Sequence, residues 1–267
     1  MDISAIMVHV DASHHTSSRL SHAVALAMAF RATLIGLLSE DIGGSAPTGP
    51  GALSCDISRH RFEAATDSAS IAVDWRVGEG SAIESMHCEG RLADLIVVSQ
   101  PEPSDGRRLV PSKHFVRATI LDTGPPVLVV PLGANVSTDV WPYARILVAW
   151  TGTRESARAL RDALPMLRNA RSVDLVSCIS PAQRRHEESS PPSYAVVWLA
   201  RRGIKAALVR LQPGFASTTG KALLDTAAGR GADLLVCGVT AQKEAGALDG
   251  LAETILAESP VPTLFSH

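Results

Sequence analysis

The stretch GRLADLIVVS at residues 90–99 returns as GRGADLLVCG at residues 229–238, and six of its ten positions are identical. Each copy passes through a short Ala-Asp turn into a continuous apolar run. A run without polar alternation is typical of a strand that is buried on both faces, as in the centre of a parallel sheet. The repeat therefore predicts one central strand in each of two similarly built halves. We expect the residue that ends this strand, Ser99 or Gly238, to face a ligand site.

The remaining sequence follows the same order in both halves, with apolar runs that alternate with amphipathic stretches at a nearly constant offset. The expected strands are Ile3–Val10, Thr33–Leu38, Ile71–Val77, Ala93–Val98 and Val127–Val130, then Ile146–Trp150, Val173–Ile179, Ala206–Leu211, Asp233–Cys237 and Pro262–Phe265. Alternation of strands and helices indicates right-handed βαβ units. The predicted fold is therefore α/β, with two doubly wound parallel sheets of five strands each.

The halves are expected at residues 1–132 and 144–267, with a linker between them. Single helices are expected at Ile57–Ser70 and Arg154–Leu167, and Ser17 or Ser18 is expected to cap the first helix. Gly43–Ser54 is rich in Gly, Pro and Ser, which predicts a loop.

Composition and charge narrow the classes of function. A net charge of −2 provides no broad field for nucleic acid or for an anionic membrane. The longest apolar run, Ala23–Phe30, is far shorter than the ~20 residues that span a bilayer. The N-terminus predicts no signal peptide, and the four cysteines form no CxxC pair. These features predict reduced thiols in a cytoplasmic protein, without a disulfide framework or a zinc site.

In a doubly wound sheet, ligands bind beyond the carboxyl ends of the strands, where the strand order reverses. If the first strand of each half is central, the loops after the first and fourth strands lie side by side. This places Asp11 near Ser99, and Thr151 near Gly238. Trp150, which ends the first strand of the second half, either stacks on a base or packs in the pocket.

At this point the chain resembles a tandem universal stress protein over almost its whole length. The resemblance rests on VHVDAS at residues 8–13, on the paired stretch, on ILVAWTGTRESARAL at 146–160, on PPVLVVP at 125–131 and on the closing VPTLFSH. It implies the fold of adenine nucleotide alpha hydrolases, with strand order 3-2-1-4-5. It also implies an internal pseudo-dimer, in which Val127–Val130 pairs with Thr263–Phe265 in antiparallel contact. A further homodimer is left open.

Many members of this family bind ATP through glycines after the fourth strand: Gly, two residues, Gly, nine residues, Gly, then Ser or Thr. Bare backbone lets N–H groups reach phosphate oxygens without side chains in the way. The first half departs from the pattern, since Ser99 and Glu102 replace the first two glycines and Pro111-Ser112 is the nearest counterpart of the closing pair. Asp11 does match the acidic residue that the family places after its first strand.

The second half keeps more of the pattern. Gly238 matches, Ala241 replaces the second glycine, Gly250 follows after eight residues, and Leu251 stands where a hydroxyl would contact phosphate. Thr151 replaces the acidic residue. Neither half therefore carries the whole site, and the candidate nucleotide-binding residues are distributed over both: Asp11, Ser99, Trp150, Thr151, Gly238, Thr240 and Gly250.

Other motifs are weaker. Gly78-x-Gly80 is a partial dinucleotide fingerprint that we interpret as a turn, since Ile83 stands where the third glycine belongs. The pairs His14-His15 and His87-Cys88 lack the spacing of metal ligands. No catalytic residues can be assigned, because Asp11 has no second carboxylate or metal partner in the sequence.

The leading hypothesis is a non-enzymatic binding protein of the stress response, with an unidentified protein partner and eroded nucleotide sites. The alternative is weak ATP binding in the second half, with slow hydrolysis left open.

Overall fold

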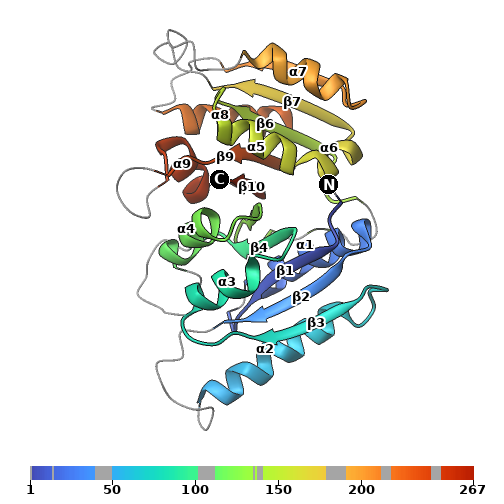
Figure 1. The fold of residues 1–267 in the computed structure, drawn as a ribbon, viewed down its shortest axis with the longest axis vertical. Coiled ribbons are helices and arrows are strands. Elements are labelled where there is room, and N and C mark those ends of the chain that lie inside the picture. Colours follow the sequence, from blue (N-terminus) through green and yellow to red (C-terminus); the bar gives the residue numbers. More distant parts are fainter. Residues whose placement is uncertain are drawn as a thin grey trace. The chain divides into compact units, whose positions relative to one another are not determined.

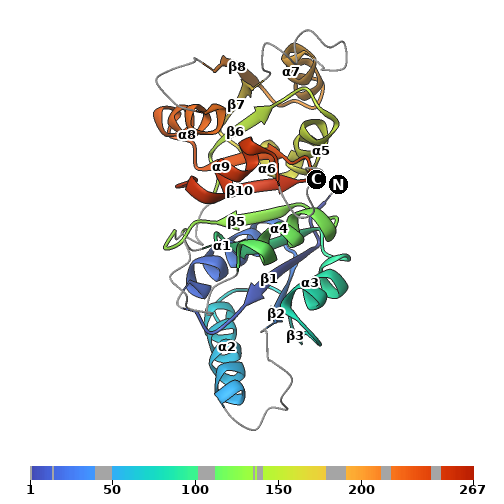
Figure 2. The ribbon, with the colours of Figure 1, turned by 90° about the vertical axis from the view of Figure 1, so that its left-hand side faces the viewer.

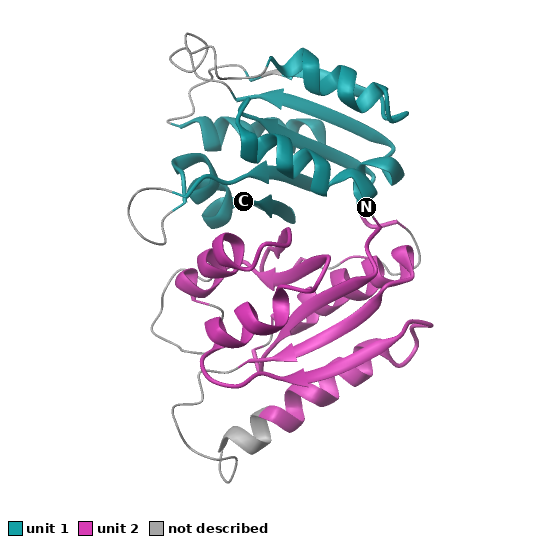
Figure 3. Cartoon of the chain, viewed as in Figure 1, with its two compact units in different colours: residues 1, 143–267 teal, residues 2–142 magenta. Residues whose placement is uncertain are grey.

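The structure is a computed structural model, and it describes residues 2–13, 15–39, 50–101, 112–134, 136, 141–178, 191–211, 218–241 and 248–267. The chain divides into two compact units (Figure 3). We call Asp2–Pro142 the N-terminal unit and Tyr143–His267 the C-terminal unit. The division falls after residue 142, so the N-terminal unit includes the stretch that the sequence suggests as a linker.

The N-terminal unit is a parallel sheet with helices on both faces (Figure 1). Its elements are β1 (Ala5–Val10), α1 (Thr16–Phe30), β2 (Thr33–Leu38), α2 (Pro50–Thr66), β3 (Val73–Val77), α3 (Ala82–Gly90), β4 (Leu95–Ser99), α4 (Lys113–Asp122) and β5 (Val127–Val130). The strand order is β3-β2-β1-β4-β5, with parallel pairing throughout. This is the predicted 3-2-1-4-5 order, and the repeated stretch forms β4 beside the central β1.

The C-terminal unit repeats this arrangement. Its elements are β6 (Arg145–Trp150), α5 (Arg154–Asp162), α6 (Leu164–Asn169), β7 (Ser172–Ser177), α7 (Pro192–Ala200), β8 (Ala206–Arg210), α8 (Thr219–Arg230), β9 (Leu234–Gly238), α9 (Gly250–Glu258) and β10 (Thr263–Ser266). The order is β10-β9-β6-β7-β8, again parallel. Ile146 aligns with Leu234 as Ile6 aligns with Leu95, so the two sheets share one register. The predicted fold class is confirmed, while the antiparallel pairing of the fifth strands stays a prediction.

Two predicted boundaries are wrong for reasons of backbone chemistry. Arg154–Leu167 is two helices, because α5 ends at Asp162 and α6 begins at Leu164 with Pro165 in its first turn. Proline lacks an N–H and its ring clashes with a carbonyl group of the preceding turn, which kinks or breaks a helix. Residues 50–54 belong to α2, whose first residue is Pro50. Proline is well tolerated at that position. Residues 43–49 lie outside the described part of the chain.

The Asp that the two repeats share has a structural role at the amino ends of the strands. Asp94 Oδ2 accepts hydrogen bonds from the N–H groups of Ser4 (2.8 Å) and Ala5 (3.0 Å). Asp233 does the same for Ala144 (3.0 Å) and Arg145 (2.8 Å). Each carboxylate accepts from two backbone N–H groups that the sheet leaves unpaired. Asp94 thereby holds the start of β1 against β4, and Asp233 holds the start of β6 against β9.

We expect Asp94→Ala to reduce the free energy of unfolding by about 2 kcal/mol, because it removes two hydrogen bonds to a charged acceptor. Asp233→Ala should cost a similar amount in the other unit, and Asp94→Asn should cost less because its amide oxygen still accepts. Urea unfolding of the three variants measures this. A loss below about 0.5 kcal/mol for both alanine variants would show that the carboxylates do not anchor the strands.

Within the described residues, no helix is long and apolar enough to cross a membrane.

Candidate functional site

The first candidate site lies where β1 ends. Asp11 is buried there, and its Oδ1 accepts hydrogen bonds from the N–H (3.0 Å) and Oγ (2.5 Å) of Ser13 and from Thr16 Oγ1 (2.7 Å). From α2, Arg61 donates to the carbonyl oxygens of Ala12 (2.8 Å) and Ser13 (2.6 Å). The loop between β1 and α1 is therefore held from both sides. The predicted cap is wrong: α1 begins at Thr16, ahead of Ser17 and Ser18, and His15 caps it without a side-chain bond.

Arg19 joins the two residues that the sequence places together. Its Nη2 lies 2.8 Å from Asp11 Oδ1, and its Nη1 donates to Ser99 Oγ at 2.9 Å. Nη2 also donates to Thr16 Oγ1 at 2.7 Å, and the whole side chain is buried. Asp11 and Ser99 thus meet through one guanidinium, in a polar cluster that we call the Asp11–Arg19–Ser99 bridge.

Our sequence reasoning missed Arg19, although the helical pattern holds a signal for it. Arg19 shares a stripe with Ala23 and Leu26, at spacings of four and seven residues, and both are fully buried. An arginine on a buried stripe requires a buried acceptor, since a guanidinium does not lose its charge in proteins. Asp11 at the end of the adjacent strand is such an acceptor.

The bridge governs the ionisation of its neighbours. Burial alone would raise the pKa of Asp11, but the Arg19 guanidinium, His9 and the Ser13 hydroxyl together hold that pKa well below its usual range. His9 is also buried, with its ring 4.8 Å from the ring of Phe115, and burial lowers its pKa to about 4. Its Nε2 pairs with the carbonyl oxygen of Ser39 at 3.1 Å. At neutral pH the cluster therefore contains one anion, one cation and a neutral imidazole.

The second candidate site, at the end of β6, has a different chemistry. Thr151 takes the place of Asp11, and Ala159 takes the place of Arg19, so both members of the ion pair are absent together. Thr151 Oγ1 lies 3.1 Å from Thr153 Oγ1, and Thr153 caps α5 by accepting from the N–H of Ser156 (3.3 Å).

Gly238 is required here by packing. A Cβ at Gly238 would collide with the backbone of Glu155 and Ser156, the first turn of α5. The helix therefore approaches the end of β9 closely only because no side chain intervenes. In the N-terminal unit Ser99 stands at the matching position, where its hydroxyl belongs to the bridge. In the family pattern this glycine contacts phosphate, but here the packing of α5 against β9 is enough to explain it.

Asp249 is the second residue that our sequence reasoning missed. It caps α9 by accepting from the N–H of Ala252 at 2.9 Å, and its other oxygen accepts from the N–H of Thr240 at 3.1 Å. Glu253 adds a second carboxylate in the first turn of α9 and accepts from the N–H of Leu248 at 3.3 Å. An Asp just before a predicted helix signals such a cap. Its bond to Thr240, nine residues earlier in the chain, depends on the tertiary fold.

The remaining candidates are placed as follows. Trp150 is buried, and Thr240 is exposed. Apart from its chain neighbours and the backbone of its own helix, no atom of the described residues lies within 4 Å of a Cβ placed at Gly250. Glu102 and Pro111 lie outside the described residues, and Ser112 caps α4 by accepting from the N–H of Phe115 at 3.1 Å.

The glycine turn has a structural role, and the histidines belong to no metal site that the described residues show. Gly80 adopts a φ of +81° just before Ser81, which caps α3, so the Gly78-x-Gly80 stretch is a turn as interpreted. His14 lies outside the described residues. Among those that the structure describes, no group of three or more His, Cys, Asp or Glu side chains could hold a metal ion.

Comparisons with known proteins agree with this architecture. No protein-family model and no curated protein matches the sequence. Among solved structures, a universal stress protein from Archaeoglobus fulgidus is 14% identical with a TM-score of 0.69, covering 98% of this chain and 97% of that chain. A putative universal stress protein from Pseudomonas aeruginosa is 18% identical with a TM-score of 0.62, covering 99% and 93%. A functionally unknown protein from the same species is 17% identical with a TM-score of 0.61, covering 99% and 92%. The chain therefore has, over both of its units, the fold of a universal stress protein of the tandem type.

Proposed function

We propose that the chain is a universal-stress-type binding protein that acts through contacts with another protein, and that its own side chains close both of its nucleotide sites. Asp249 provides the main support. A phosphate group at the start of α9 would need the free N–H groups of that turn and of the loop after β9. The Asp249 carboxylate already accepts from two of these donors, Thr240 and Ala252. Together with Glu253 it would also repel a phosphate, by about 1 kcal/mol for each charge at ~4 Å in water.

The N-terminal unit supports the proposal in a different way, through a buried ion pair. Asp11 would have to face a ligand, but it is buried and paired with Arg19, while the Ser99 hydroxyl accepts from the same guanidinium. A ligand that used either group would have to break a buried, charge-assisted contact. The described residues of the two units therefore argue against a tightly bound ATP.

The second candidate function is weak ATP binding in the C-terminal unit. The open space around Gly250 and the exposure of Thr240 favour it, since bare backbone at a helix start suits an anion. This function requires Asp249 to leave the Thr240 N–H.

We propose no catalytic function. Asp11 is held ionised by Arg19 and so is a poor proton donor, and its salt bridge also makes it a poor base.

A cytoplasmic location is consistent with cysteines that form no disulfide bonds. All four cysteines are free, and burial raises the pKa of Cys178 to about 12, which keeps it unreactive.

Nucleotide release and one substitution test the proposal together. We expect purified protein to release no material absorbing at ~260 nm when it is heat-denatured. Asp249→Asn, which keeps a good cap but removes the charge, should give measurable ATP binding in a calorimetric titration in which the wild type gives no saturable heat up to ~1 mM. Asp225→Asn, which removes a charge from the exposed face of α8, is the matched control. Released nucleotide, or no measurable binding to Asp249→Asn, would contradict the closed site.

A further inference from the structure

The edge strand of the C-terminal sheet has exposed apolar residues. β8 is last in the strand order and pairs only with β7 among the described strands (Figure 2). Leu208 in β8 is 45% exposed, and on the neighbouring α7 Tyr194 is 68% and Val197 is 49% exposed. An edge strand has backbone N–H and C=O groups without a partner strand, and a further extended chain can pair with them.

The charge of this edge has one sign. Residues 191–211 include Arg201, Arg202, Lys205 and Arg210 but no Asp or Glu. The Arg201, Arg202 and Lys205 side chains are exposed, and the Arg202 guanidinium lies 3.6 Å from the centre of the Trp198 ring. In the adjacent β7, the carboxylate of Asp174 is paired with Arg230, which donates to its two oxygens at 2.7 and 2.8 Å. Asp174 therefore does not neutralise the basic residues of the edge.

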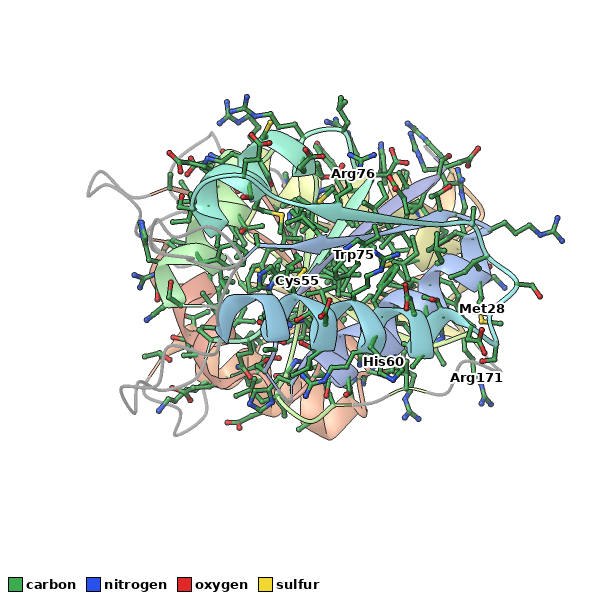
Figure 4. The ribbon with its side chains drawn as sticks, turned by 90° about the horizontal axis from the view of Figure 1, so that it is seen from below. Met28, Cys55, His60, Trp75, Arg76 and Arg171 are labelled. Carbon is green, nitrogen blue, oxygen red and sulfur yellow. The ribbon has the colours of Figure 1, made fainter. Side chains whose placement is uncertain are left out.

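The matching edge of the N-terminal unit is built differently. In β3, Arg76 pairs with Asp74 (2.9 Å) and with Glu89 of α3 (2.7 Å). Trp75 points to the other face and packs toward α2, with its ring 5.4 Å from that of Phe62 (Figure 4). Charges in the middle of an edge strand are a common protection against pairing. The two units share one fold, so the basic edge at β8, which has no charge in the middle of the strand, is a property of the C-terminal sequence.

We infer that β8 and α7 form a docking surface for an acidic, extended segment of another protein, which adds to the sheet beside β8. The backbone groups of β8 supply the pairing, Leu208 and Val197 supply apolar contact, and Arg201 and Lys205 attract the carboxylates. A second copy of this chain is the wrong partner, because pairing β8 with itself brings two sets of four basic residues together. This inference names the partner class for the proposed binding function, and it does not involve the nucleotide sites.

A fluorescein-labelled peptide of alternating Glu and Val tests the surface by fluorescence anisotropy on the full chain at low salt. We expect saturable binding to the wild type, and binding about tenfold weaker to Arg201→Glu/Lys205→Glu, in which two attractions become repulsions. Arg91→Glu, an exposed reversal at the end of α3, is the matched control and should change affinity less than about twofold. The same peptide with every backbone nitrogen methylated keeps its charge but has no N–H on either edge to pair as a strand, and it should also bind about tenfold more weakly.

Three results would overturn the inference: no binding up to ~1 mM, equal binding of a Lys-Val peptide, or equal binding of the N-methylated peptide. Any of them would leave the closed nucleotide sites standing, because ATP titrations report on those sites separately. ATP binding would likewise leave this surface unaffected.

Discussion

Arg19→Met lowers the free energy of unfolding of the N-terminal unit by about 3–5 kcal/mol, because it leaves a buried carboxylate without its cation. Asp11 is buried, and the largest contribution that keeps it ionised in the wild type comes from Arg19, 2.8 Å away, with smaller ones from His9 and Ser13. Methionine keeps much of the volume of arginine, so the loss reports on charge more than on a cavity. Urea unfolding measures it, and hydrogen exchange in peptides from β1 and β4 assigns it to this unit.

The C-terminal unit suggests the matched control. It has Thr151 and Ala159 where the N-terminal unit has Asp11 and Arg19, and it builds the same sheet. The double variant Asp11→Thr/Arg19→Met should therefore recover at least about half of the loss, since no unpaired charge remains. A single variant that loses less than about 1 kcal/mol, or a double variant no better than the single one, would contradict the ion pair as described.

Lowering the pH from about 6.5 to about 4 reduces the free energy of unfolding through two histidines. Burial lowers the pKa of His9 and of His22 from 6.5 to about 4, although the Asp11 carboxylate and the Ser39 and Ala134 carbonyls partly oppose the shifts. Between these values the unfolded chain binds protons that the native state does not, so the stability present above pH 6.5 is lost toward pH 4. Each histidine contributes at most about 3 kcal/mol. Asp11, whose native pKa is depressed, adds a further loss only below its unfolded pKa of about 4.

The variant His9→Gln/His22→Gln cannot titrate at these positions, and its stability should change much less over the same pH range. His60→Gln, on an exposed part of α2, should keep the wild-type slope. Urea unfolding at intervals between pH 7 and pH 4 compares the slopes, so the comparison holds even if the double variant is less stable throughout. Equal slopes in wild type and double variant would show that the two histidines are not buried in neutral form.

Local patterns were sufficient to predict the sheets, because a strand buried on both faces leaves a continuous apolar run. β5 even has the predicted bounds, Val127–Val130. The break between α5 and α6 was missed although Pro165 marks it, since the apolar spacing continues past the proline.

The chemistry of the sites was less predictable, because it depends on contacts between residues far apart in the chain. The sequence places Asp11 and Ser99 at the ends of adjacent strands, but the bond that joins them spans 80 residues and comes from Arg19. The bond from Thr240 to Asp249 likewise follows from how the loop after β9 folds. Glycine counting predicted weakened sites and pointed to Ser99, but it could not point to Asp11, Arg19 or Asp249, which stand at none of the glycine positions and which we propose also help to close the sites.

Calorimetric titration of Mg-ATP into the full chain at pH 7.5 tests the central proposal, the closure of both sites, most directly. We expect no saturable heat at nucleotide concentrations up to ~1 mM, because the donors that would hold phosphate are already bonded to Asp249 and the Asp11–Arg19–Ser99 bridge is closed. A dissociation constant in the micromolar range, with one or two sites per chain, would contradict it.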